Sequence, residues 1–189
     1  MVFQGYIRSL IDMPLSKADE IATHFEASSF KRSEIFLSPG SISRKTIFLS
    51  EGFIRAYIVD RDGNEVTTRI FSPPTLLNDF LSFFRKEPSK EFYQAITDCQ
   101  IQTIDFEHLQ TCFHTIPEFR EAGRMMLTLN YASLHNQMLS YHTKTAEERY
   151  QELVVKRPDV IQNVPLKIIA SYLGMTDSSL SRIRKSLSK

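Results

Sequence analysis

The sequence has few of the residues that build metal centres and disulfide frameworks. Cys99 and Cys112 are its two cysteines, too few for a disulfide scaffold or for the four thiolates of a typical iron–sulfur cluster. Its five histidines stand apart, at positions 24, 108, 114, 135 and 142, and form no H-x-x-x-H pair. We therefore predict no metal and no cofactor, and we expect both cysteines to be buried apolar side chains.

Long hydrophobic runs are also missing. No segment approaches the ~18 consecutive apolar residues of a membrane span. The first twenty residues lack the order of a signal peptide, which is a basic region followed by an apolar one. We therefore expect no membrane partner and a cytoplasmic protein.

Glycine is scarce where many enzymes need it. The six glycines include none between Gly63 and Gly123, and no glycine-rich phosphate loop and no G-x-S-x-G nucleophile motif is present. We expect no catalytic residues, and we predict that the protein is not an enzyme.

Residues 30–106 are rich in short segments of Ile, Phe, Val, Tyr and Thr, separated by turn signals such as Pro39-Gly40 and Asp62-Gly63. Such a series predicts an antiparallel β-roll of the jelly-roll type, and with the helices that flank it an α+β fold. The turn at Asp62-Gly63 imitates the start of a calcium loop. Its glycine falls at the fourth position instead of the sixth, so we interpret it as a hairpin turn.

Helical periodicity precedes and follows the strands. Apolar spacing predicts a helix over residues 14–28, and Pro117 suits the first turn of a long helix with two apolar stripes. The first stripe is Phe119, Ala122, Met126 and Leu129, and the second is Leu127, Tyr131, Leu134, Met138 and Tyr141. The second stripe has the three–four spacing of a helix–helix seam. We expect the first to dock on the strands and the second to form a homodimer; burial of both within one chain is the alternative.

Two further patterns follow the long helix. Thr145 and Glu148 form a capping box, which makes residues 142–145 a joint, and the next helix is expected to bury Tyr150, Leu153 and Val154. In residues 166–185, LKIIASYLGMTDSSLSRIRK, Gly174 ends one helix and Thr176 caps another. The expected buried residues are Leu166, Ile169, Ala170 and Leu173, then Leu180, Ile183 and Leu187. Two short helices joined by a tight glycine turn form a helix-turn-helix motif.

The C-terminal end is basic. Residues 140–189 hold nine Lys or Arg and five Asp or Glu, a net charge of +4, whereas the chain carries +1. Such an end suits a polyanion, although basic residues also suit a helix C-terminus. The outward face of the second helix is expected to carry Asp177, Ser178, Ser181, Arg182 and Lys185, with Arg182 reaching a guanine. Phosphate contacts are expected from Lys167, Thr176, Ser179 and Lys185.

A strand-rich roll, a long helix and a helix-turn-helix, in this order, resemble the Crp/Fnr family of bacterial transcription regulators. Residues 145–187 resemble its winged-helix DNA-binding domain, and residues 48–71 resemble the middle strands of its cyclic-nucleotide-binding-like roll. The resemblance implies a roll over residues 1–116, a dimerisation helix over 117–142 and a DNA-binding domain over 143–189. It also implies a homodimer on a near-palindromic double-stranded operator, RNA polymerase as a further partner, and an effector of unknown identity.

The resemblance breaks in residues 71–95. Family members that bind cyclic AMP have a phosphate cassette here, in which a Gly-Glu pair approaches the phosphate and ribose and an Arg-Ser pair neutralises the phosphate. Those pairs fall on Asn78-Asp79 and Ser89-Lys90, which implies a degenerate effector pocket without cyclic AMP binding. The apolar residues around it either fill the pocket, which we favour, or line one for an apolar effector: Leu76, Leu77, Phe80, Phe83 and Phe84.

A second departure is that the sequence stops four residues after Lys185, where longer family members continue into a β-hairpin wing. Phosphate contacts are therefore expected from the helices alone. The rival hypothesis is an effector-binding or protein-interaction signalling module that does not bind DNA. Such a module would have no salt-dependent affinity for DNA.

Overall fold

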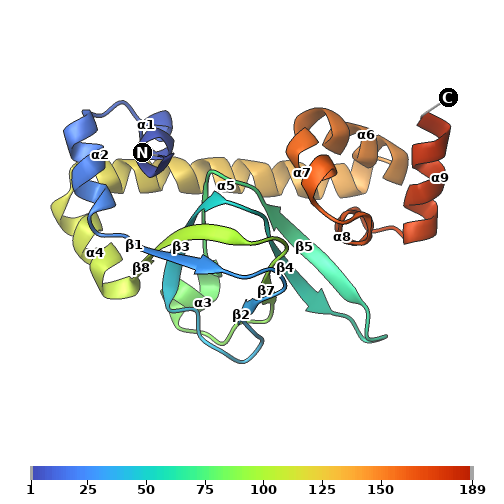
Figure 1. Cartoon of the computed structure of the whole chain (residues 1–189), viewed down its shortest axis with the longest axis horizontal. Coiled ribbons are helices and arrows are strands. Elements are labelled where there is room, and N and C mark those ends of the chain that lie inside the picture. The colour runs from blue at the N-terminus through green and yellow to red at the C-terminus, as the bar shows by residue number, and fades with distance from the viewer. Residues whose placement is uncertain (1, 188–189) are drawn as a thin grey trace.

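The computed structural model, which describes residues 2–187, is built around two antiparallel four-stranded sheets that form a roll (Figure 1). One sheet has the order β1-β8-β3-β6 and the other the order β2-β7-β4-β5. The strands are β1 (Glu26–Phe30), β2 (Ile35–Leu37), β3 (Lys45–Glu51), β4 (Ile54–Val59), β5 (Glu65–Phe71), β6 (Thr75–Leu77), β7 (Phe92–Ala95) and β8 (Cys99–Asp105). The predicted α+β fold with an antiparallel roll is confirmed.

Side chains of both sheets fill the inside of the roll. Leu49, Ile54, Tyr93 and Cys99 belong to this core, because alternate residues of each strand point to the same face. The turn between β4 and β5 is the predicted hairpin, closed by the amide of Asp60, which donates to the carbonyl of Asn64 at 2.9 Å.

The N-terminal region differs from the prediction of one helix over residues 14–28. It contains α1 (Val2–Leu10) and α2 (Leu15–Ala22), and β1 already begins at Glu26. Residues 26–30 pair with β8, with Ala27 opposite Gln102. The ladder with a distant strand therefore outweighs the local helical spacing. Phe25 lies within the range predicted as helix. It is buried in the core beneath α1 and α2.

Three more helices extend this core. They are α3 (Phe80–Arg85), α4 (Phe106–Thr115) and α5 (Pro117–Thr143), and α5 starts at the predicted proline. Phe119 and Ala122 of α5 are buried against α1, α2 and the roll. A Cβ on Gly123 would lie 2.6 Å from the ring of Phe113, so this glycine lets α4 and α5 approach closely. Beyond it α5 leaves the core, and Leu129 of the first predicted stripe is 53% exposed, which that prediction did not anticipate.

The C-terminal unit packs at the other end of α5, opposite α1 and α2 (Figure 1). It consists of α6 (Ala146–Lys156), α7 (Pro158–Asn163), α8 (Leu166–Tyr172) and α9 (Asp177–Leu187). Its core includes Tyr150, Leu153, Ile169, Ala170, Leu173 and Leu180 and continues into Phe53, Ile70 and Ile96 of the roll. Three residues predicted to be buried are exposed: Val154, Leu166 and Leu187. Each lies at an edge or an end of its helix, beyond the reach of the packed face.

The expectations about cysteines, membrane spans and metal sites can be compared with the described residues only. Cys99 and Cys112 are both buried free thiols, as expected. Within residues 2–187 no helix is long and apolar enough to cross a membrane. The same residues contain no group of three or more His, Cys, Asp or Glu that could hold a metal ion. Lys189, counted above with the basic end, and residues 1 and 188 lie outside the described residues.

Candidate functional site

The segment predicted as a degenerate cassette folds into β6, α3 and the loop to β7. Asp79 is the N-cap of α3, and its Oδ1 accepts from the amide of Ser82 at 3.2 Å. Its Oδ2 accepts from the hydroxyl of Ser89 at 2.6 Å, and that hydroxyl accepts from the amide of Glu91 at 3.1 Å. Asp79, Ser82 and Ser89 are all buried. The carboxylate is therefore occupied by donors of its own chain.

A second polar group, which sequence reasoning missed, lies half-buried near Asp79. Arg69 of β5 forms an ion pair with Glu91 at 2.8 Å and donates to the hydroxyl of Tyr93. That hydroxyl donates to the carbonyl of Asn78 at 3.2 Å, and burial raises the pKa of Tyr93, which keeps it neutral. The guanidinium of Arg69, which could have bound an anionic ligand, is therefore already paired with a carboxylate of the same chain.

The remaining predicted pocket residues take different positions. The side-chain amide of Asn78 donates from Nδ2 to Thr46 Oγ1 at 2.9 Å, and Lys90 is exposed at the surface. Among the apolar residues, Leu77 and Phe83 are buried, as filling of the pocket requires. Leu76, Phe80 and Phe84 are less buried and line, with Leu77, a groove of about 680 Å³ between the roll and α5.

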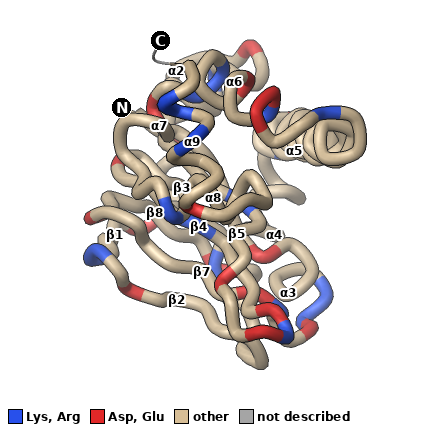
Figure 2. Tube along the Cα trace, turned by 90° about the vertical axis from the view of Figure 1, so that its right-hand side faces the viewer, with Lys and Arg blue, Asp and Glu red and all other residues tan. Residues whose placement is uncertain are grey.

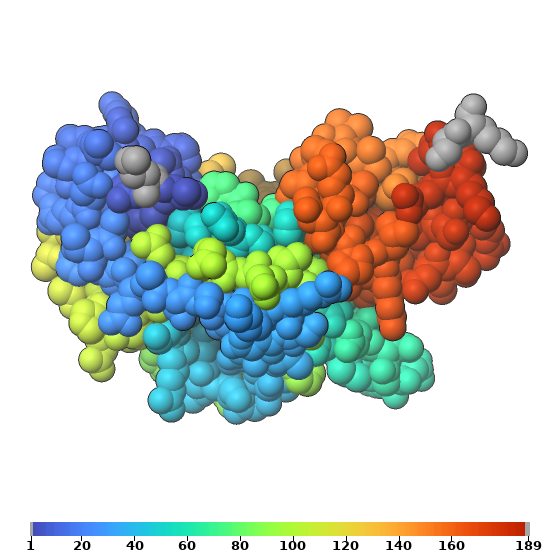
Figure 3. All heavy atoms as spheres, in the orientation of Figure 1, coloured from blue at the N-terminus to red at the C-terminus, as the bar shows by residue number. Residues whose placement is uncertain are grey.

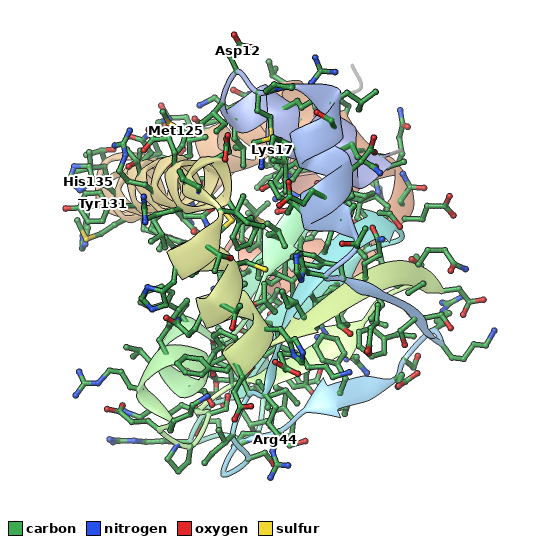
Figure 4. The ribbon with its side chains drawn as sticks, turned by 90° about the vertical axis from the view of Figure 1, so that its left-hand side faces the viewer. Asp12, Lys17, Arg44, Met125, Tyr131 and His135 are labelled. Carbon is green, nitrogen blue, oxygen red and sulfur yellow. The ribbon has the colours of Figure 1, made fainter. Side chains whose placement is uncertain are left out.

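The groove continues along α5 into the second apolar stripe. Leu127, Tyr131 and Leu134 line it, and all five residues of the stripe are exposed, Tyr131 by 73%. Figure 4 shows Tyr131 and His135 on α5 at the edge of the molecule. Tyr141, at the end of the stripe, donates its hydroxyl to the carbonyl of Tyr172 on α8.

The helix-turn-helix motif has the predicted geometry. Gly174 adopts φ +68°, a left-handed conformation that L side chains rarely adopt, and ends the turn after α8. The amide of Met175 donates to the carbonyl of Ala170 at 3.0 Å. Thr176 Oγ1 accepts from the amide of Ser179 at 3.2 Å and so caps α9. Leu180, 1% exposed, anchors α9 on α8.

The outer face of α9 carries the predicted DNA-contacting residues. Asp177, Ser178, Ser181, Arg182 and Lys185 are exposed, as are Lys167 on α8 and Thr176 in the turn, whereas Ser179 is half-buried beside Thr176. Figure 2 shows basic positions on α9 at the end of the molecule that faces the viewer. Short polar side chains at the start of a helix, with an arginine one turn later, suit a major groove. Figure 3 shows the C-terminal unit, α6 to α9, as a protruding lobe.

Comparisons with known proteins agree with this architecture. Residues 27–115 match the family model of the cyclic nucleotide-binding domain. The chain is similar to the c-di-GMP-responsive global regulator CLP of Xanthomonas campestris, with a TM-score of 0.72 and 15% identity over 93% of this chain and 92% of that one. FixK2 of Bradyrhizobium japonicum gives 0.69 and 20% over 87% and 84%. A regulator from Eubacterium rectale, assigned to the Crp/Fnr family, gives 0.69 and 14% over 94% and 84%. No curated protein matches the sequence.

Residues 27–115 are therefore similar to a cyclic nucleotide-binding domain. The overall fold of the chain is that of the Crp/Fnr transcription regulators, as the resemblance implied.

Two features bear on whether this segment could hold a cyclic nucleotide. The acid that would hold a ribose hydroxyl, Asp79, is engaged by Ser82 and Ser89. The position that the resemblance implies for the phosphate-binding arginine is Ser89, whose hydroxyl donates to Asp79.

Proposed function

We propose that the protein is a sequence-specific DNA-binding transcription regulator of the Crp/Fnr type. The observation that carries the proposal is the exposed face of α9, which the Gly174 turn and the buried Leu180 hold on a helix-turn-helix core. In the proposed division, residues 1–116 form the sensor roll, 117–142 the dimerisation helix and 143–189 the DNA-binding domain. The proposal places the protein in the cytoplasm, with RNA polymerase as a further partner.

We further propose a homodimer in which the second stripe of α5 faces that of a second copy. α5 has 27 residues, about 40 Å of helix, and the stripe exposes large apolar side chains that a monomer would leave in water. A two-fold dimer places two α9 helices on a near-palindromic operator with half-sites about 34 Å apart. Light scattering tests it: Leu134→Asp should give monomers, whereas Leu166→Asp, an exposed leucine on α8 outside the stripe, should leave the dimer intact.

The DNA contacts are tested by selecting sites from a random library. Arg182→Ala should relax the sequence preference and weaken binding by ~1–3 kcal/mol, because an arginine can bind a guanine with two hydrogen bonds. Lys185→Ala should weaken binding to all sequences about equally and lower the salt dependence. An unchanged site profile for Arg182→Ala would exclude this residue as a base contact. Absence of any salt-dependent DNA affinity would favour a signalling module instead.

The roll is proposed not to bind cyclic AMP usefully. Loss of a charge-assisted phosphate contact alone costs ~1.5–3 kcal/mol, which is about one to two decades of affinity. The Asp79–Ser89 and Arg69–Glu91 contacts support the proposal, because a nucleotide would have to displace them. Calorimetry with cyclic AMP and cyclic GMP should give no heat of binding, and micromolar affinity for either would contradict the proposal.

A further inference from the structure

The hydroxyl of Ser171 forms hydrogen bonds that link the edge strand β5 of the roll to the helix-turn-helix. β5 lies at the edge of its sheet, so groups on its outer side lack a neighbouring strand. The hydroxyl of Ser171, on α8, accepts from the amide of Thr67 at 2.8 Å and donates to the carbonyl of Glu65, also at 2.8 Å. It thereby takes the place of a partner strand.

Arg157 makes a second connection to the far end of the same strand. It lies where α6 meets α7, and its guanidinium donates to the carbonyl of Ile70 at 2.9 Å and to Ser72 Oγ at 2.8 Å. Ile70 is also buried in the core of the C-terminal unit. We call the contacts of Ser171 and Arg157 with β5 the β5 clamp.

The C-terminal unit is also attached to α5. Arg149 of α6 donates to the carbonyls of Lys144, in the joint, and Leu173, in the turn. Its guanidinium lies 5.1 Å from the ring centre of Tyr141. These contacts hold one side of the unit, and the β5 clamp holds another. A body fixed at two separate places has less freedom to rotate than a body fixed at the joint alone.

The β5 clamp determines the position of α9 without covering it. α8 and α9 share a core through Ile169, Ala170 and Leu180, so α9 follows α8. α8 lies beside β5, while α9 stands at the outer end of the molecule (Figure 1). Ser171 faces the roll, and the exposed residues of α9 are left available.

We propose that Ser171 and Arg157 are positioning residues that set the distance and angle between the two α9 helices of a dimer. They would thereby determine which half-site spacing the protein prefers. The inference rests on the proposed function, since spacing has a meaning only for a dimer on DNA. One base pair moves a half-site by about 3.4 Å and rotates it by about a tenth of a turn, so a rigidly held α9 discriminates between spacings and a loosely held one does not.

The test uses the full chain and the best selected site, with the spacer between half-sites changed by one or two base pairs. Ser171→Ala and Arg157→Gln should each leave affinity for a single half-site within about twofold. Each should lower the preference for the best spacer over its neighbours by about two- to tenfold, the equivalent of one lost hydrogen bond. Ser186→Ala, which removes an exposed hydroxyl of α9, is the matched control and should change neither quantity.

The outcomes separate the two proposals. A wild-type spacer profile in both variants, with half-site binding intact, would overturn the β5 clamp and leave DNA binding standing. Absence of DNA binding by the wild-type chain would overturn both. Ser171→Ala removes one oxygen and Arg157→Gln shortens a long side chain, so thermal unfolding of each variant shows whether it is folded at the assay temperature, and the proposal can be tested with either one.

Discussion

The cassette of the roll and the outer face of α9 use the same kinds of residue in opposite ways. In the cassette, Asp79, Ser89 and Arg69 are bound to groups of their own chain. On α9, Asp177, Ser181 and Arg182 are exposed. Polar groups that hydrogen-bond to one another stabilise a fold, whereas polar groups exposed to solvent can exchange their bound water for a ligand. The contrast supports the proposal that the cassette is structural and that α9 is the element that recognises DNA.

The largest expected effect tests whether the exposed face of α9 depends on the core beneath it. Leu180→Ala should destabilise the C-terminal unit by ~2–5 kcal/mol, because it leaves a cavity in a closely packed core. Thermal unfolding and DNA affinity should fall together. Leu187→Ala on the same helix, where the side chain is 45% exposed, should cost under ~0.5 kcal/mol. Equal costs for the two variants would contradict the assigned packing of α9.

The next effect compares the two aspartates that begin helices. Asp79→Ala removes the cap of α3 and one of the two acceptors of the buried hydroxyl of Ser89, the other being the carbonyl of Glu91, so the roll should lose ~1–3 kcal/mol. Asp177→Ala removes an exposed acid from the first turn of α9 and should cost under ~1 kcal/mol. Denaturant unfolding measures both. If Asp79→Ala costs no more than Asp177→Ala, the cassette is not held together by this carboxylate.

Local signals account for most of what the sequence predicts correctly. The capping box of Thr145 and Glu148 and the turn at Gly174 involve residues within a few positions of one another. Their physical causes, a satisfied helix end and a left-handed φ, depend little on the rest of the chain. The stripe of α5 is equally local, although Tyr141 has a second partner in Tyr172 that periodicity cannot indicate.

The missed contacts join residues far apart in the sequence. β1 forms because it pairs with β8, and Arg69 of β5 meets Glu91 in the loop before β7. Ser171 binds β5 across more than a hundred residues. No spacing rule connects such positions, since only the folded sheets bring them together. The sequence could therefore indicate the cassette as a candidate site, but not the Arg69–Glu91 ion pair beside it.

The smallest expected effect concerns Glu152 of α6, whose partner Lys144 lies in the joint between α5 and α6. It forms ion pairs with Lys144 at 2.6 Å and Lys156 at 2.5 Å. Hydrogen bonds from Lys144 and Lys156 lower the pKa of Glu152 from its usual 4.5 to about 2. The lowered pKa means that these contacts stabilise the folded chain above pH 4.5 and are lost as the pH falls through about 2.

Glu152→Gln should accordingly lower the free energy of unfolding by under ~1 kcal/mol at pH 7, as expected for ion pairs near the surface. The difference from wild type should shrink between pH 4.5 and about 2, and 1 M salt at pH 7 should remove most of it. Thermal unfolding midpoints across this range measure both effects. A difference that does not change with pH would mean that Glu152 acts through packing. The joint would then be held by Arg149 and Tyr141 rather than by the ion pairs of Glu152.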